Sequence, residues 1–411
     1  MSTVKTSSMD LVGIGSAERV DRRRQSALLG TPLLVVGVAL AAANLRPAVT
    51  SMSSVLGEVR EDVGASVMWA SVLTAVPTVC FGLAAVAAPW LGRRFGMARA
   101  IGLALAVLTA GLLLRIVDGP WVVLGGTFVA AAGIAIGNVL IPVVVKESFP
   151  HAVGRVTGIY TAALAAGGGI GAGATPMLES MLGSWRGAVG AWAALSAAAL
   201  VVWMFGARHG TDGDTRVADA EPRRSLLRSP LAWVVTAFFG LQACGAYILM
   251  GWLSELFVSE GIARTDAGLM LAFINLIAIP LSFLIPPFAL NRSSQSGWIA
   301  AVAGSSVAGV IGLAVAPTAA PWLWTVLLGI GMAVLPLALG VIALRTRGAS
   351  ETTELSAMAQ GFGYLIGASG PFLFGVLHGV TASWTAPLIL LGVVMVAQGV
   401  VGWLAGRPRF V

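Results

Sequence analysis

The residues with the clearest potential for chemistry are Asn44, Arg46 and Pro47, which lie together in an otherwise apolar stretch. Arg46 precedes Glu58 by 12 residues, which is about 18 Å along a helix at ~1.5 Å per residue. If this stretch crosses a membrane, Arg46 lies near its middle. A guanidinium keeps its proton and costs ~2.5–3.5 kcal/mol at that depth on insertion scales. Arg46 must therefore face protein or a water-filled cavity, where it is suited to binding an anion.

The alternative for Arg46 is a structural role in which helix carbonyls satisfy its guanidinium. A neighbouring acid is excluded as the partner, because no Asp or Glu lies in the interior of any predicted span. Arg46 is also the only Lys, Arg, Asp or Glu that we expect deep within a span, since Arg115 comes at a span end.

Pro47 predicts a break in the helix at this position. It has no N–H, so the carbonyl of Ala43 loses its helical partner, and the ring disfavours α geometry at Arg46. A break exposes polar backbone beside the guanidinium, as at other transport sites. The alternative is a simple kink that binds nothing.

Other polar side chains inside apolar stretches are candidates for contact with a ligand. Gln360 and Tyr364 are four residues apart and so share one face of a helix. The remaining candidates of this kind are Gln242, Tyr247, Asn138 and Tyr160. The alternative for each is a hydrogen bond that merely bridges two helices.

The composition is that of a membrane protein. Of 411 residues, 57% are apolar and 10% are charged, whereas a soluble chain is about 25% charged. Uncharged stretches long enough to cross a bilayer as helices recur along the chain. They are 66–92, 119–145, 156–178, 187–207, 229–254, 267–291, 355–377 and 379–406.

Four further spans complete a prediction of twelve transmembrane helices. The stretch 293–344 is long enough for two spans, which a turn at Pro317 and Pro321 divides. The other two are 31–57, which carries Arg46, and 100–117, which ends near Arg115. We predict an all-α membrane protein with two pseudo-symmetric halves of six helices. The expected divisions are a tail at 1–28, bundles at 29–207 and 230–405, a linker at 208–229 and a second tail at 406–411.

The basic residues predict the orientation. If the N-terminus is cytoplasmic, the cytoplasmic segments hold 20 of the 25 Lys and Arg residues, as the positive-inside rule requires. The opposite side holds Arg60, Arg115, Arg186 and Arg264. Both termini are therefore expected in the cytoplasm, with the protein in the inner or plasma membrane.

Several segments together resemble the major facilitator superfamily, and within it the cyanate/nitroimidazole permease family. They are NLRPAVT at 44–50, PWLGRRFG at 89–96, FFGLQ at 238–242, MAQGFGY at 358–364, Gly370-Pro371 and Ser383-Trp384. Arg94 and Gly96 match the superfamily's cytoplasmic loop pattern, where Arg93 replaces an Asp. The resemblance implies a twelve-helix fold, a conformational role for this loop, and alternating-access transport of a cyanate-like or nitroimidazole-like substrate.

The leading hypothesis is a secondary active or facilitative transporter for a small anion, with lipid and its substrate as partners. One rival is an exporter of neutral aromatic compounds with a structural Arg46, and another is a membrane sensor that moves nothing. Coupling to protons is left open, and a monomer is expected by analogy.

No catalytic, metal, cofactor or nucleic-acid site is expected. The three histidines are scattered, and the two cysteines lie in apolar runs. The basic residues occupy short segments between spans rather than one nucleic-acid-binding face. Residues 167–172 fit G-x-G-x-x-A but lie inside a span, whereas a dinucleotide site needs a strand followed by a helix.

Overall fold

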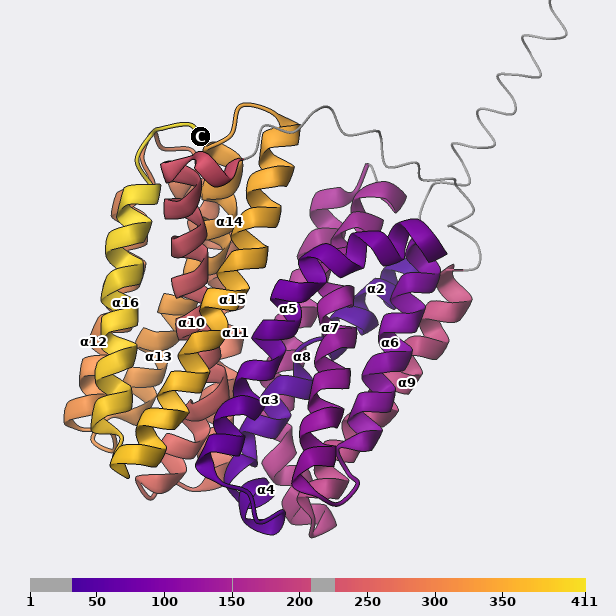
Figure 1. Cartoon of the computed structure of the whole chain (residues 1–411), viewed down its shortest axis with the longest axis vertical. Helices are drawn as coiled ribbons and strands as arrows, with labels where there is room; N and C mark the ends of the chain where they lie inside the picture. The colour runs from indigo at the N-terminus through magenta and orange to yellow at the C-terminus, as the bar shows by residue number, and fades with distance from the viewer. Residues whose placement is uncertain (1–31, 150, 208–225) are drawn as a thin grey trace, which may run out of the picture.

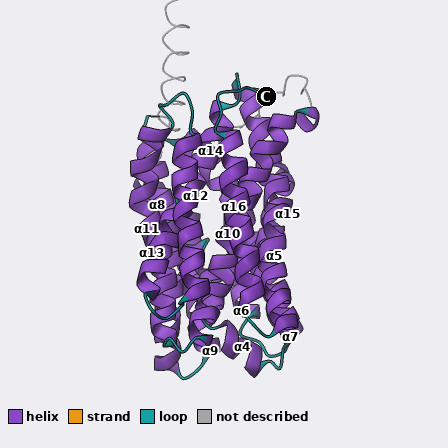
Figure 2. Cartoon of the chain, turned by 90° about the vertical axis from the view of Figure 1, so that its left-hand side faces the viewer, coloured by secondary structure: helices purple, strands orange, loops and turns teal. Residues whose placement is uncertain are grey.

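The computed structural model describes residues 32–149, 151–207 and 226–411, and every regular element in these ranges is a helix (Figure 2). The predicted tail at 1–28 and residues 208–225 of the predicted linker lie outside the described part of the chain. The predicted divisions between bundles therefore stay a prediction.

The first group of helices runs from α2 to α9 and is drawn in indigo to magenta (Figure 1). Its members are α2 (Pro32–Asn44), α3 (Pro47–Ser54), α4 (Leu56–Asp62), α5 (Val67–Phe95), α6 (Met97–Leu114), α7 (Pro120–Ser148), α8 (Val153–Leu182) and α9 (Trp185–Ala207).

The second group follows the short 3-10 helix η1 (Leu226–Arg228) and lies beside the first (Figure 1). Its members are α10 (Pro230–Ser259), α11 (Arg264–Ala289), α12 (Ser296–Val315), α13 (Pro321–Met332), α14 (Val334–Leu344), α15 (Ala349–Thr381) and α16 (Thr385–Ala405).

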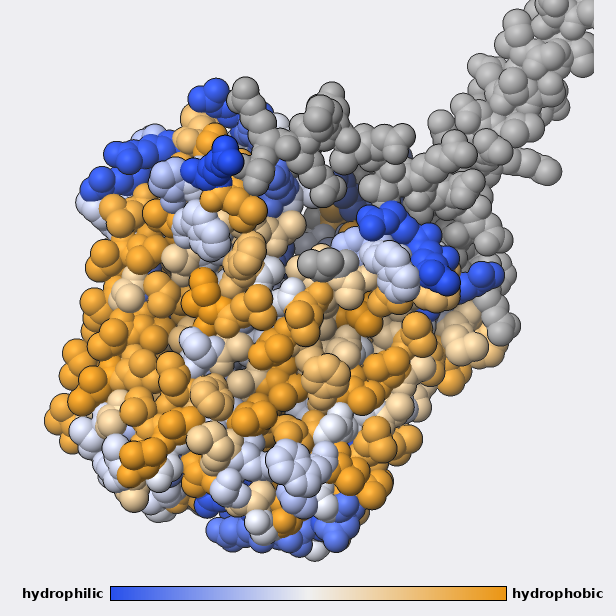
Figure 3. Space-filling view, viewed as in Figure 1, coloured by the Kyte–Doolittle hydropathy of each residue, from blue (hydrophilic) through white to orange (hydrophobic). Residues whose placement is uncertain are grey.

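Twelve membrane crossings follow from these helices. Eleven segments are long and apolar enough to cross, with α2–α3 and α13–α14 each counted as one. The remaining long helix, α8, has 30 residues, or about 45 Å at ~1.5 Å per residue, against a hydrocarbon core of about 30 Å. It is rich in glycine, which lowers its mean hydropathy. With α8, the eleven crossing segments become twelve. Apolar side chains cover the middle of the visible surface, as expected for a membrane-spanning bundle (Figure 3).

The main contacts between the two groups join α5 with α15, α8 with α11, and α3 with α10. Smaller contacts join α5 with α10 and α3 with α11. At the end of the bundle that carries α4, named here the α4 end, an apolar cluster contains residues of both groups, among them Leu56, Trp69, Trp252 and Phe257. The opposite end carries the C-terminus and is named the C-terminus end (Figure 1).

An ion pair also joins the groups at the α4 end. Nη1 of Arg264, on α11, lies 2.9 Å from Oε1 of Glu58, on α4. The carboxylate of Glu255, on α10, packs against Gly57, where a Cβ atom would come within 2.8 Å of Oε2. Charged side chains from three helices therefore meet where the groups touch.

The glycines of α8 allow it to lie against the interrupted helix α2–α3. A Cβ atom at Gly167 would come within 2.1 Å of the carbonyl oxygen of Ala43, and one at Gly171 within 2.7 Å of Cα of Pro47. The G-x-G-x-x-A segment is therefore a packing surface, in agreement with the rejection of a dinucleotide site.

The prediction of a loop at Arg93, Arg94 and Gly96 is wrong for the two arginines. Helix α5 continues through Pro77 and Pro89, so that both arginines lie in its last turn. Gly96 ends the helix with φ of +81° and begins the link to α6, a conformation that suits glycine. Basic side chains at a helix C-terminus are favoured by the helix dipole, which explains why the helix continues through them.

Replacement of Gly167 by Ala should destabilise the protein, because backbone of α2 occupies the space that the methyl group needs. An overpacked site costs about 1–3 kcal/mol, and the midpoint of thermal unfolding of the purified protein should fall. Gly304→Ala is the control, since a Cβ atom there meets nothing within 4 Å. Equal midpoints for the two variants would contradict the packing role of Gly167.

The contact between the groups at the α4 end should depend on pH through Glu58. Burial raises the pKa of this carboxyl above its ordinary 4.5, and Glu61 and Glu255 raise it further against the lowering effect of Arg264. If separation of the groups restores the ordinary pKa, protonation favours the contact. The free energy that protonation of Glu58 contributes to the contact is fully present below pH 4.5, the ordinary pKa. This contribution is lost as the pH rises through the raised pKa.

Spin labels on α4 and α11 would measure this dependence as a distance distribution. We expect the short-distance population to be larger at about pH 5 than at about pH 7. Glu58→Gln should abolish the difference, whereas Glu260→Gln, at an exposed carboxyl outside this cluster, should keep it. An unchanged pH response in the Glu58 variant would refute the assignment.

Candidate functional site

A cavity of about 110 Å³ lies between the two groups, and residues of α8, α10, α11, α13, α14 and α15 line it together with Arg46. Its polar lining residues are Arg46, Thr161, Gln242, Tyr247, Asn275, Ser282 and Tyr364. The cavity therefore brings together the predicted residues Arg46, Gln242, Tyr247 and Tyr364, which are far apart in sequence.

Arg46 lies in the interruption between α2, which ends at Asn44, and α3, which begins at Pro47. Its φ and ψ are −112° and −34°. The residue therefore stays in the right-handed helical region, contrary to the expectation that Pro47 disfavours α geometry there, although its φ departs from the regular helical value. The side chain is half-buried. The interruption thus places a guanidinium at the cavity wall.

The partner of Arg46 is a neutral amide. Its Nη1 donates to Oδ1 of Asn275 over 3.2 Å, and Nδ2 of Asn275 donates to the carbonyl of Leu271 over 2.9 Å, which orients the amide. The ion pairs among the described residues all lie at the α4 end and do not include Arg46. The charge in the cavity wall is therefore without an acidic partner in the described structure.

Aromatic rings hold the two tyrosines of the cavity. Phe81 of α5 lies 5.7 Å from the ring of Tyr247 and 5.4 Å from that of Tyr364, measured between centroids. Phe239 contacts Tyr364 edge-on at 5.2 Å. Since Phe81 belongs to the first group and the other rings to the second, this cluster links the two groups beside the cavity.

The other predicted site residues have partners away from the cavity lining. Asn44 donates to the carbonyl of Leu40 over 2.8 Å, and Gln360 donates to the hydroxyl of Ser356 over 2.8 Å. The hydroxyl of Tyr160 lies 3.5 Å from Oδ1 of Asn138. The Tyr160–Asn138 contact bridges α8 and α7, the alternative given above for such residues, whereas the bonds of Asn44 and Gln360 lie within their own helices.

Ser282 of the lining was missed by sequence analysis. It follows Asn275 by seven residues on α11, a spacing that places both on one helix face. A search for polar residues at that spacing would have found it. Asn275 was visible as a polar residue within a span, but its contact with Arg46 depends on the packing of α11 against α8.

Arg115 corrects the expectation that Arg46 alone is a deep cation. Its side chain is 1% exposed, with Nε donating to Oγ1 of Thr127 over 3.0 Å and Nη1 donating to the carbonyl of Ala48. Ala48 lies in the first turn of α3, close to the interruption. The long side chain turns from the end of α6 towards the interior, which its position at a span end did not reveal.

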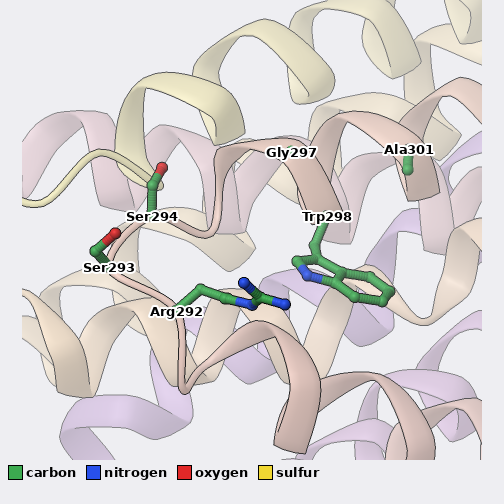
Figure 4. Close-up of a pocket in the computed structure, with 6 residues that line it drawn as sticks. All are labelled: Arg292, Ser293, Ser294, Gly297, Trp298 and Ala301. Atoms are coloured by element: carbon green, nitrogen blue, oxygen red, sulfur yellow. The ribbon is translucent and has the colours of Figure 1, made fainter.

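A larger hollow, of about 510 Å³, lies at the link between α11 and α12. Arg292 and Trp298 point into the same space there, beside Ser293 and Ser294 (Figure 4). One short segment of the chain forms this hollow, and its arginine is exposed. It does not lie between the two groups, so the cavity at Arg46 is the stronger candidate.

Comparison with known proteins places the chain in a family. The model of the Major Facilitator Superfamily matches residues 33–371. The chain is 33% identical to the 2-nitroimidazole transporter of Escherichia coli (strain K12) over 92% of its length and 96% of that protein. It is 27% identical to the cyanate transport protein CynX of the same organism, over 83% of this chain and 88% of that one.

Solved structures agree with the fold. A bacterial homologue of the human lysosomal transporter Spinster, in an inward-facing and unoccupied conformation, superposes with a TM-score of 0.73 at 15% identity. The match covers 92% of this chain and 98% of that one. The chain therefore belongs to the major facilitator superfamily and, within it, to the cyanate/nitroimidazole permease family of small-molecule transporters.

Proposed function

We propose that this transporter carries a small anion, or a small molecule rich in acceptor oxygens, and that Arg46 binds it. The observation that carries the proposal is a guanidinium in the wall of a cavity between the two groups, paired with the amide of Asn275 rather than with an acid. An anion at this place gains charge-assisted hydrogen bonds and compensates a charge that is costly inside a membrane.

The size and the walls of the cavity favour a particular range of substrates. Its volume of about 110 Å³ is below the ~300–1,000 Å³ of sites for drug-sized ligands. Tyr247 and Tyr364 present aromatic edges or faces, and Gln242 an amide. A cyanate-like anion suits the guanidinium, and a nitroimidazole-like ring, with acceptor oxygens on an aromatic body, suits both the guanidinium and the tyrosines. The two relatives carry compounds of these kinds by name.

The exporter of neutral aromatic compounds remains the second candidate. The aromatic cluster of Phe81, Tyr247 and Tyr364 supports it, and Arg46 would then be structural. The two candidates differ in what competes for the site, because small anions should displace the substrate only if Arg46 binds an acceptor group. The third candidate, a membrane sensor that binds a ligand without transporting it, is disfavoured because the chain belongs to a family of transporters.

We further propose that the C-terminus end is cytoplasmic, with both termini on that side of the inner or plasma membrane. The exposed basic residues of this end include Arg93, Arg292, Arg347 and Arg409, as the positive-inside rule predicts. The apolar cluster and the Glu58–Arg264 pair then close the outer side. Alternating access requires these contacts to separate when the cavity opens outward.

Coupling to protons would take a route outside the cavity. The residues that line it include no Asp, Glu or His, which also favours passage of the substrate over catalysis. The proton-sensitive group at the interface of the two groups is Glu58. A monomer suffices as the working unit, because a single chain lines the cavity.

Uptake into liposomes tests the role of Arg46. Wild-type protein should take up cyanate or 2-nitroimidazole, and Arg46→Gln should lower uptake at low substrate about 10- to 100-fold, since hydrogen bonds to a charged group contribute about 1.5–3 kcal/mol. Arg46→Lys reports whether a point charge suffices or the planar guanidinium is required.

Arg292→Gln serves as the matched control, because this exposed arginine lies at the α11–α12 link, away from the cavity (Figure 4). It should transport as the wild type does. Equal uptake by Arg46→Gln and the wild type, with both folded, would rule out the anion site. Inhibition of 2-nitroimidazole uptake by small anions separates the anion site from the neutral-aromatic exporter.

A further inference from the structure

Gln398 is a buried amide whose hydrogen bonds are incomplete. It lies on α16, its side chain is 2% exposed, and its Nε2 has no hydrogen-bond partner within the described ranges. A buried N–H without a partner is destabilising, and nearly all such groups in folded proteins bind another residue or an ordered water. The position of Gln398 therefore requires an explanation.

The space that Gln398 borders is a second, smaller pocket, within the helices of the second group. Its volume is about 10 Å³, which is about the space that one water molecule needs. Gln242 of α10 and Ser306 of α12 also line it, so that two amides and one hydroxyl converge there. A pocket that is polar and holds two or more partners is suited to a buried water.

The interruption between α13 and α14 borders this pocket. Met332 ends α13 and Val334 begins α14, and both line the pocket. Pro336 has no N–H, so it leaves the carbonyl of Met332 without its usual helical donor.

A metal cation fits this pocket poorly. Every side chain that lines it is neutral, and the adjoining substrate cavity shares Gln242, Ala246 and Met332 and contains the guanidinium of Arg46. The orphan group of Gln398 is an N–H donor, which repels a cation. Water satisfies the donor and the acceptors together.

We infer that one water molecule occupies this pocket and that Gln398 acts through it as a positioning residue for Gln242. The inference rests on the proposed function, since Gln242 is taken to contact the substrate from the wall shared by the two cavities. Through the water, Gln398 and Ser306 hold the Gln242 amide in one orientation. Gln398 itself does not line the substrate cavity.

The test measures transport kinetics of 2-nitroimidazole and of cyanate in liposomes for Gln398→Met, which keeps the length of the side chain and removes its hydrogen bonds. KM should rise about 5- to 10-fold, the effect of one lost water-mediated hydrogen bond, while the maximal rate stays near that of the wild type. Ser306→Ala should raise KM about 2- to 3-fold, because one of several water partners is lost.

Two comparisons separate positioning from general damage to the structure. Ser305→Ala removes the neighbouring hydroxyl, which donates to the carbonyl of Leu327 over 2.8 Å and does not line the pocket; its KM should equal that of the wild type. The double variant Gln242→Met/Gln398→Met should be no worse than Gln242→Met alone, since coupled residues are not additive. Additive effects, or an unchanged KM in Gln398→Met, would overturn the inference.

An experimental density map at high resolution supplies a readout that does not depend on transport. A density peak for water between Gln242, Ser306 and Gln398 supports the inference, and it should be absent in Gln398→Met. A dry pocket in the wild type overturns the water site even if uptake is normal. Conversely, a water peak in a protein that transports neither probe contradicts the proposed function and leaves the water site standing.

Discussion

The guanidinium of Arg46 is the constraint on which the arrangement around the cavity depends. A permanent charge in a membrane bundle needs polar surroundings, and three features of the chain supply them. Pro47 interrupts the helix, the glycines of α8 let that helix approach the interruption, and Asn275 of α11 provides an oriented acceptor. Each comes from a different span, so the site forms only when both groups of helices are assembled.

Under the proposed function, the position of this charge joins substrate binding to the contact between the groups. Arg46 belongs to the first group, whereas Asn275, Gln242 and Tyr364 belong to the second. A molecule bound between them touches both sides, and its binding free energy therefore depends on how the groups are placed. At the α4 end the groups are joined by apolar packing and by the Glu58–Arg264 pair, which is the contact that any opening on that side has to break.

At the cavity the two groups present different chemistry, a cation on the first and neutral amides on the second. Arg46 and Arg115 are held by an amide oxygen, a hydroxyl and a backbone carbonyl. Opposite them, Gln242 lines both the cavity at Arg46 and the small pocket at Gln398. At the cavity the first group thus presents a charge, and the second presents neutral polar groups, which cost less to bury.

The sequence by itself determined the membrane class, the twelve crossings, the interruption at Pro47 and the presence of an arginine within the first span. These depend on local properties: the hydropathy of a stretch, the missing N–H of proline and the cost of an arginine at mid-depth. It also named Gln242, Tyr247 and Tyr364 as polar residues within spans, but it could not separate them from Asn44, Gln360, Asn138 and Tyr160. All have the same residue types in the same kind of segment.

Only the tertiary structure decided which side chains share a cavity, because that depends on the rotation and packing of helices far apart in sequence. It paired Arg46 with Asn275, a contact across 229 residues of chain, turned Arg115 inward against α3, and extended α5 through the basic residues that resemble a loop. A single sequence carries no record of such distances. The contacts follow from the close approach of α8 to α2, α3 and α11, which the glycines permit but do not specify.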